Sequence, residues 1–391
     1  MKPMPRHSNQ ITKKTFRPGS GIQLLHDRLR ELAFAKGPEA KLPTVRELCA
    51  EYQTSSTSLN DVLKDLEASN VIYRRQGSGI FVSPKIHSQN IYALINASLV
   101  DQYGVSPFWG MLWAKLVRES QKRAAHKNEE IHFQLVASGP ELMNALPPDF
   151  AQLLDSGRID GLMTIGMGLT DALLTIPSSF PMISFAGLGH WFVATENGRV
   201  VGEAVRRLAA LGCRRIGLFN PSLEWVPDRL TERFDFDPTA AFRAALEQSG
   251  LEYKLDLHFE GGLSVEEILR VGPSNLTPPV AGHQQQGYAT AMQVFQDKRA
   301  SWPDGLVITD DMMTLGVLGA MRKLGIQPGH DIKIASHSNA GSPVLFGWEE
   351  DLILWQADPA EIARAIYMQL DTLMSGEKTE QYVHVHQGFP D

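Results

Sequence analysis

Apolar residues in the first part of the chain recur at helical spacing and then form two short runs. The spacing predicts a helix over Ile22–Ala35, a helix of about two turns after Pro43, and a longer helix after a Ser/Thr cluster. Two β-runs follow at residues 71–74 and 80–82, and the glycines between them permit a tight hairpin. Helices followed by a hairpin in this order predict a winged helix-turn-helix.

From Ile91 onward, near-continuous apolar runs alternate with amphipathic segments. Such runs are typical of parallel strands that are covered by helices on both faces. About three hundred residues of this pattern exceed one open sheet, so we expect two lobes that face a cleft, with ligands at the carboxyl ends of the strands. The predicted strands are 91–96, 131–136, 161–166 and 181–186 in a first lobe, then 215–220, 255–260, 305–310 and 331–336, with helices at 109–126, 197–211, 239–248, 288–297 and 312–324.

Length and composition fit a folded protein of two or three domains, because the chain has 391 residues of which 43% are hydrophobic. No run of about eighteen apolar residues occurs, and the first residues lack the apolar core of a signal peptide. We therefore expect a cytoplasmic protein. Cys49 and Cys213 are the only cysteines, so no disulfide framework is expected.

Charge is divided unevenly along the chain. Residues 1–85 hold 14 basic and 8 acidic side chains, whereas the remainder of the chain holds 23 basic and 36 acidic side chains. A basic head on an acidic body favours a module that binds a polyanion, attached to a body that does not itself bind DNA. We divide the chain into a mobile basic arm at 1–18, a winged helix-turn-helix domain at 19–84, a linker at 85–90, and an effector-binding and dimerisation domain at 91–391.

The head carries side chains that are suited to duplex DNA. The arginines are candidates for phosphate contacts, a glycine-rich wing can approach the minor groove, and short polar side chains at the start of the third helix can reach base edges. The alternative is that Ser55 and Ser56 only cap that helix and that the arginines lie on a solvated face. The candidates are Thr44, Arg46, Ser55, Ser56, Thr57, Ser58, Asn60, Arg74, Arg75, Gln76, Gly77, Ser78 and Gly79.

The segment from about Ile22 to Val82 resembles the DNA-binding domain of the GntR family. KLPTVREL is similar to the proline-led second helix of that family, and RRQGSGIFV is similar to its wing. The resemblance implies binding to double-stranded DNA. It also shows a departure, because Ser56 and Asn60 stand where the family commonly has arginines. We therefore expect base recognition to depend on Asn60, on the Ser/Thr hydroxyls and on the wing.

Two segments of the body resemble the effector-binding domain of the LacI family and its periplasmic sugar-binding relatives. They are NGRVVGEAVRRLAALGCRRIGLF at 197–219 and GLVITDDMMTLGVLGAMRKLGI at 305–326, and the resemblance covers about residues 90–389. It implies a two-lobed body in which Asp311 hydrogen-bonds ligand hydroxyls. The alternative for Asp311 is that it caps the helix that begins at Met312.

The aromatic residues of the predicted loops are further ligand candidates, because aromatic faces stack on the C–H faces of sugars. The alternative is that these aromatic residues only pack against neighbouring side chains and contact no ligand. The family's ligand-gripping arginine is missing, since Pro238 and Ala241 stand at the corresponding positions, and Arg229 or Arg233 is a possible replacement. The ligand candidates are Phe108, Trp109, Asn220, Trp225, Asp311 and His337.

Motifs of catalysis or metal binding do not support an enzyme. His384 and His386 alternate as on an exposed strand without a nearby cysteine, so we expect no metal site there. His283 and the three glutamines after it are interpreted as a polar loop before a helix. No Gly-x-Ser-x-Gly, HExxH or Walker run occurs. We expect no cofactor and no catalytic residue.

The sequence therefore predicts an α/β protein with a winged helix-turn-helix head and a two-lobed, periplasmic-binding-protein-like body. We interpret it as a ligand-responsive transcription regulator and repressor, which binds operator DNA as a homodimer and takes a small polar effector such as a sugar. The alternative is an enzyme or sensor with a flavodoxin-like α/β body and an accessory nucleic-acid-binding head. A plain solute-binding protein is disfavoured because no export signal is seen.

Overall fold

The structure is a computed structural model, and it forms two compact units. The first unit, the head, comprises Met1–Gln89 with Leu153–Arg158, and the second unit, the body, comprises Asn90–Gln152 with Ile159–Asp391. Most of the predicted basic arm, together with Trp225, Arg229 and Arg233, lies outside the described residues. These are 18–101, 106–137, 146, 150–155, 157–167, 173, 175–187, 189–221, 237–260, 282–296, 299–377 and 380–389.

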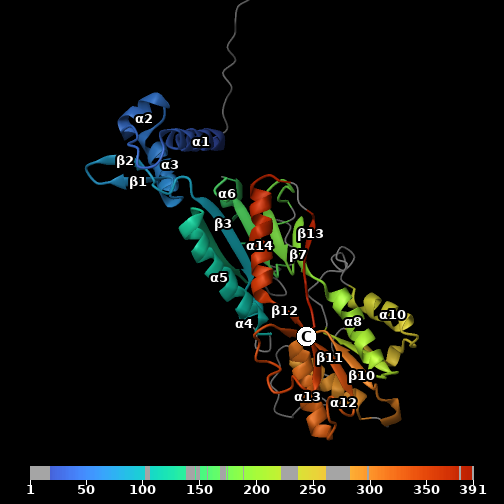
Figure 1. Ribbon diagram of the computed structural model, residues 1–391. Coiled ribbons are helices and arrows are strands. Elements are labelled where there is room, and N and C mark those ends of the chain that lie inside the picture. The colour runs from blue at the N-terminus through green and yellow to red at the C-terminus, as the bar shows by residue number, and fades with distance from the viewer. Residues whose placement is uncertain are drawn as a thin grey trace, which may run out of the picture. The chain divides into compact units, whose positions relative to one another are not determined.

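The head has the predicted order of elements (Figure 1). Helix α2 begins after Thr44, whose hydroxyl accepts from the Glu47 amide while the Glu47 carboxylate accepts from the Thr44 amide, which is a capping box. Helix α3 begins after Ser55, whose hydroxyl accepts from the Ser58 amide. The elements are α1 Pro18–Lys36, α2 Val45–Glu51, α3 Ser56–Ala68, β1 Ile72–Arg75 and β2 Gly79–Val82, with β1 and β2 antiparallel.

The head closes over its own apolar core, in which the predicted helical stripe of α3 is buried. Leu59, Val62, Leu63 and Leu66 are each at most 2% exposed. Leucines of α1 and α2 and isoleucines of the wing pack on this stripe. The turn of the wing contains Gly77 and Gly79 at φ of 73° and 119°, a backbone region that favours glycine.

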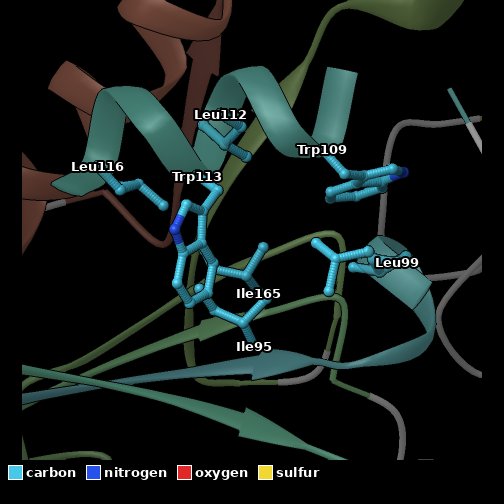
Figure 2. Close-up of a pocket in the computed structure, with 8 residues that line it drawn as sticks. Ile95, Leu99, Trp109, Leu112, Trp113, Leu116 and Ile165 are labelled. Atoms are coloured by element: carbon cyan, nitrogen blue, oxygen red, sulfur yellow. The ribbon is translucent and has the colours of Figure 1, made fainter. Parts of the chain in front are cut away.

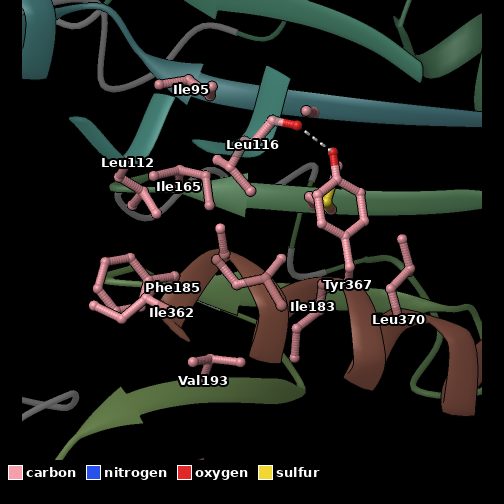
Figure 3. Close-up of a cluster of buried hydrophobic side chains, with 14 of the residues drawn as sticks. Ile95, Leu112, Leu116, Ile165, Ile183, Phe185, Val193, Ile362, Tyr367 and Leu370 are labelled. Atoms are coloured by element: carbon pink, nitrogen blue, oxygen red, sulfur yellow. Dashed lines mark hydrogen bonds between the residues drawn. The ribbon is translucent and has the colours of Figure 1, made fainter. Parts of the chain in front are cut away.

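The first lobe of the body, the N-lobe, is built on a six-stranded sheet of order β13-β7-β6-β5-β3-β4, in which every strand pair that the register defines is parallel. Helices α5 and α14 pack together on one face, where the Tyr367 hydroxyl donates to the Leu116 carbonyl at 3.0 Å (Figure 3). The elements are β3 Gln89–Asn96, α4 Ser98–Asp101, α5 Phe108–His126, β4 Glu129–Val136, α6 Phe150–Asp155, β5 Gly161–Ile165, β6 Met182–Phe185, β7 Trp191–Thr195, α14 Pro359–Met374 and β13 Tyr382–Val385.

The second lobe, the C-lobe, is a parallel five-stranded sheet of order β12-β11-β10-β8-β9. Alternate residues of β10 serve opposite faces, because Leu306 and Ile308 pack under α12 and α13 while Val307 packs under α8 and α10. The elements are α8 Asn197–Ala210, β8 Ile216–Asn220, α10 Pro238–Gln248, η1 Leu255–Leu257, β9 His258–Glu260, α12 His283–Val294, η2 Arg299–Ser301, β10 Gly305–Ile308, α13 Asp311–Leu324, β11 Lys333–Asn339 and β12 Leu352–Ala357.

The predicted two-lobed α/β body is confirmed, but the assignment of chain segments to lobes was incomplete. The chain returns to the N-lobe after β12, because β13 pairs with β7 and α14 packs on β5, β6 and β7. Strands β7 and β12 were not predicted. This return depends on pairing between strands that lie far apart in the chain. The local periodicity of the sequence does not indicate which strands pair. None of the described helices is long and apolar enough to cross a membrane.

Candidate functional site

A group of polar side chains gathers in the C-lobe where β8, β10 and β11 end. Asn220 is the last residue of β8, Asp310 and Asp311 follow β10, and Asn339 is the last residue of β11. All strands of this sheet are parallel, so their carboxyl ends meet at one edge, which is the usual ligand position in such sheets. Asn220 accepts a hydrogen bond from the Thr309 hydroxyl, which ties β8 to β10 at this edge.

Asp310 is the structural carboxylate of the group. Its Oδ1 accepts from the Met313 amide at 2.7 Å and caps α13, and its Oδ2 lies 3.0 Å from Nδ1 of His283. The predicted loop at His283 is therefore wrong, because His283 is the first residue of α12. Helix α12 packs against α13, and the pair of His283 with Asp310 joins the first residue of α12 to the residue that caps α13.

Asp311 is the buried carboxylate of the group and is 1% exposed. Its Oδ2 accepts from the Ser106 hydroxyl at 3.2 Å and from Nδ2 of Asn339 at 3.0 Å. Its Oδ1 has no hydrogen-bond partner among the described residues, and neither has Oδ1 of Asn339. The capping alternative for Asp311 is wrong because Asp310 performs that role. Ser106 belongs to the N-lobe, so Asp311 lies where the two lobes meet.

The charges of this group are set by burial and by mutual proximity. Burial opposes the imidazolium of His283, but the Asp310 carboxylate outweighs it and raises the pKa of His283. Burial also opposes ionisation of Asp310, yet His283 keeps the pKa of Asp310 below its usual range. For Asp311, burial and then the neighbouring Asp310 charge raise the pKa. Burial lowers the pKa of His337 although both aspartates oppose this.

Asp311→Asn is expected to stabilise the ligand-free body. The folded-state pKa of Asp311 is raised, so the ionised carboxylate destabilises the fold above that pKa, and this penalty disappears as the pH falls through it. The variant should therefore melt roughly 2–4 °C higher near pH 8, as about 1 kcal/mol would produce. The difference should shrink in acid. Thermal unfolding between about pH 4 and 8 checks this prediction, and an equal difference at every pH would contradict it.

The remaining predicted ligand residues are placed as follows. His337 lies in β11 near both aspartates. Phe108 and Trp109 occupy the first turn of α5, partly buried against the N-lobe core and in contact with Phe185. Trp225 lies outside the described residues. Ligand contacts by these residues stay predictions, and Ser106, Asn339 and His283 were not among the candidates because only the tertiary structure brings them to Asp311 and Asp310.

Trp109 also lines a small apolar cavity of about 10 Å³ inside the N-lobe (Figure 2). The other lining residues are Ile95, Leu99, Val100, Leu112, Trp113, Leu116 and Ile165. A space of this size holds no more than about one water molecule, and its apolar walls would give a water no partners. We therefore assign no ligand to this cavity. No group of side chains able to hold a metal ion occurs in the described part of the chain.

The head presents the predicted DNA-contact residues on α2, α3 and the wing. Thr44 caps α2, and Ser55 caps α3 as the alternative interpretation stated, whereas Ser56 does not cap that helix. Ser56, Thr57 and Arg46 are exposed. The wing turn with Gln76, Gly77 and Ser78 is also exposed. Arg74 and Arg75 differ in their surroundings. Arg74 pairs with Glu67 at 3.2 Å, whereas Arg75 lies over the rings of Tyr73 and Phe81.

Comparison with known proteins identifies the head. Residues 22–82 match the family model "Bacterial regulatory proteins, gntR family". "Probable fructoselysine utilization operon transcriptional repressor" of Escherichia coli (strain K12) is 33% identical over 102 residues, which are 26% of this chain and 37% of that protein. "Uncharacterized HTH-type transcriptional regulator YurK" of Bacillus subtilis (strain 168) is 31% identical over 86 residues, 22% of this chain and 35% of that protein. The chain thus spans about a third of the length of these relatives.

Comparison with solved structures identifies the fold of the body. A regulatory protein of the LacI family from Chloroflexus aggregans superposes with a TM-score of 0.59 at 16% identity, over 76% of this chain and 96% of that chain. A LacI family transcriptional regulator from Lactobacillus casei with bound sucrose superposes with a TM-score of 0.52 at 15% identity, over 78% of this chain and 98% of that chain. The chain therefore joins a DNA-binding domain of the GntR type, at residues 22–82, to a body with the fold of LacI-family transcription regulators.

Proposed function

We propose that this protein is a ligand-responsive transcription regulator, a repressor whose affinity for operator DNA changes when a small polar molecule binds between the two lobes of its body. The observation that carries the proposal is the pairing of a GntR-type head with a LacI-like body whose lobes meet at a buried carboxylate. The matched relatives named above, a described operon repressor among them, support the regulatory role.

The effector is a molecule rich in hydrogen-bond donors, such as a sugar. Buried Asp311 and Asn339 each carry an oxygen acceptor that lacks a partner among the described residues. Leaving a buried acceptor unpaired costs about 1–3 kcal/mol, so a ligand that donates one hydroxyl hydrogen to each of the two oxygens would recover this energy. The bound sucrose of the Lactobacillus casei structure supports a sugar-like ligand for this fold. The Ser106 hydroxyl already donates to the other oxygen of Asp311, Oδ2.

Ligand binding acts on DNA through the arrangement of the lobes. A ligand that bonds to Asp311 beside Ser106 changes the contact that these two residues make between the lobes. Two copies of the chain form a dimer through their bodies and place two heads on a two-fold symmetric operator, so a change within each body alters the separation of the heads. The change in operator affinity is bounded by the difference in ligand affinity between the two states.

The adjacent carboxylates of Asp310 and Asp311 do not favour the enzyme alternative. A reactive pair of carboxylates would leave both groups available to a substrate. Both oxygens of Asp310 are engaged, one by the Met313 amide and one by His283. The matched regulators also point away from catalysis.

The test starts from the full chain and a pool of random duplex DNA. We expect it to enrich one sequence, and we expect affinity for that sequence to fall steeply with salt because phosphate contacts release counterions. A panel of sugars and amino sugars is then screened for thermal stabilisation, and each binder is added to the DNA titration. Failure to enrich any sequence, together with a flat salt response, would reject DNA regulation. Stabilising sugars that leave operator affinity unchanged would reject ligand control.

A further inference from the structure

Arg74 of the wing is held by the third helix of the head. Its Nε lies 3.2 Å from Oε2 of Glu67, and its backbone amide donates to Oε1 of the same carboxylate at 3.2 Å. One carboxylate of α3 therefore fixes both the backbone and the side chain of β1 at this residue. Glu67 neutralises the guanidinium, so Arg74 is a poor partner for a phosphate. A phosphate placed there would also meet the negative charge of Glu67.

The free end of Arg74 is turned toward the DNA-reading end of α3. Its Nη1 donates to Oδ1 of Asn60 at 3.4 Å, while Nδ2 of Asn60 donates to the Ser56 carbonyl at 2.9 Å. Both polar atoms of the Asn60 amide are thus engaged, and the donor on Arg74 defines which one is the oxygen. An asparagine amide in a fixed orientation presents its donor and acceptor to a base edge in one way only.

Arg75 has the opposite surroundings. Its side chain is 62% exposed, and its guanidinium lies 5.3 Å and 5.5 Å from the ring centroids of Tyr73 and Phe81. These two rings stack on each other with centroids 5.6 Å apart, and Nζ of Lys41 lies 5.8 Å from the Phe81 ring. The pair of rings therefore supports two exposed cations. Glu39 approaches Arg75 only to 4.0 Å at an exposed position, where an ion pair contributes little.

We propose that the two adjacent arginines of the wing have different roles in DNA binding. Arg74 is a positioning residue that orients Asn60 and locks the wing to α3, so it determines which sequence is read. Arg75, together with Lys41, contacts phosphates and contributes affinity that does not depend on sequence. The proposal rests on the proposed DNA-binding function. It adds a specificity determinant that touches no base.

The experiment uses the full chain and the duplex that the wild-type protein enriches from a random pool. Affinity for this duplex and for a scrambled duplex is measured over a salt series for Arg74→Ala, Arg74→Lys, Glu67→Gln and Arg75→Ala. Arg75→Ala should weaken binding to both duplexes by the same factor and reduce the salt slope by about one. Arg74→Ala and Glu67→Gln should lower the ratio of specific to scrambled affinity by about 5- to 150-fold, and Arg74→Ala should keep the salt slope of the wild type.

The variant Arg74→Lys distinguishes the positioning role of Arg74 from the effect of its positive charge. Lysine keeps the positive charge but lacks the guanidinium fork that spans Glu67 and Asn60, so it should lose specificity as Arg74→Ala does. Full affinity and specificity in Arg74→Lys, or an equal loss on both duplexes with a smaller salt slope in Arg74→Ala, would overturn the proposal. If the wild-type protein enriches no duplex, the proposed function fails before this question arises.

Asn60→Ala provides a readout that survives any loss of stability in the Arg74 variants. Its side chain lies on the helix surface and takes no part in the core of the head. Asn60→Ala should lose preference at the same base pairs as Arg74→Ala, and the double variant should lose no more than either single variant. Additive losses at different base pairs would show that Arg74 does not act through Asn60, and the proposal would be wrong.

Discussion

Gly316→Ala is expected to destabilise the body by about 3 kcal/mol or more, at the upper end of the cost of overpacking. A Cβ at Gly316 would lie 2.0 Å from the Gln284 carbonyl oxygen and 2.7 Å from the Tyr288 amide of α12. Both are backbone atoms and cannot rotate away, so α12 must move. The first residue of α12 is His283, so the ion pair with Asp310 should also lengthen.

Gly319→Ala in the same helix is the matched control. A Cβ there would lie 3.7 Å from the Tyr288 ring, which is ordinary van der Waals contact. The variant should be stabilised by about 0.5–1 kcal/mol, because alanine loses less backbone entropy than glycine in a helix. Thermal unfolding should separate the two variants by roughly 8 °C or more. Equal melting temperatures would show that α12 and α13 can move apart freely.

Arg123→Met is expected to cost about 3–5 kcal/mol, because it leaves a buried charge unpaired. The Arg123 side chain is 7% exposed, and it bonds both oxygens of Glu129, whose side chain is 2% exposed. It also bonds Asp371 of α14 and lies 4.7 Å from the Tyr367 ring centroid. These contacts connect α5, β4 and α14, so the loss should lower the melting temperature of the body by roughly 6–20 °C.

Lys122→Met is the control for charge and for helix position. Lys122 precedes Arg123 on α5, but its side chain is 64% exposed and, among the described residues, pairs with Glu119 alone, so its loss should cost about 0–1 kcal/mol. The double variant Arg123→Met with Glu129→Gln should recover part of the stability, because the unpaired buried charge is then absent. Equal destabilisation by Arg123→Met and by the double variant would attribute the effect to packing. These measurements use denaturant or thermal unfolding of the full chain.

Local interactions explain why so much of the fold was predictable. Helix α2 begins where Thr44 and Glu47 form a capping box within four residues, and α3 begins where Ser55 caps it. The stripe of Leu59, Leu63 and Leu66 defines the buried face of α3 before any partner is known. The alternating runs of the body similarly define buried strands, and their number indicated two lobes.

The site was predictable only in part. Asp311 lies after the carboxyl end of β10, where its place in the sequence predicted it, yet its neighbours could not be inferred, since Ser106 lies in the other lobe. The role of His283 was misjudged because its partner Asp310 follows a strand, β10, outside the segment that contains it. The difference between Arg74 and Arg75 likewise depends on Glu67 and on the ring pair of the wing.

What the sequence alone determined is most of the helices and strands, the basic head and the acidic body, because caps, periodicity and charge act over a few residues. What only the tertiary structure decided is the return of α14 and β13 to the N-lobe, the Arg123 network, and the meeting of Ser106, Asp311 and Asn339. Apart from the bond between Arg123 and Glu129, which lie six positions apart, these contacts join residues from distant parts of the chain, as the bond between Arg123 and Asp371 does. Their free energy depends on burial and on pairing partners that exist only once the sheets have assembled.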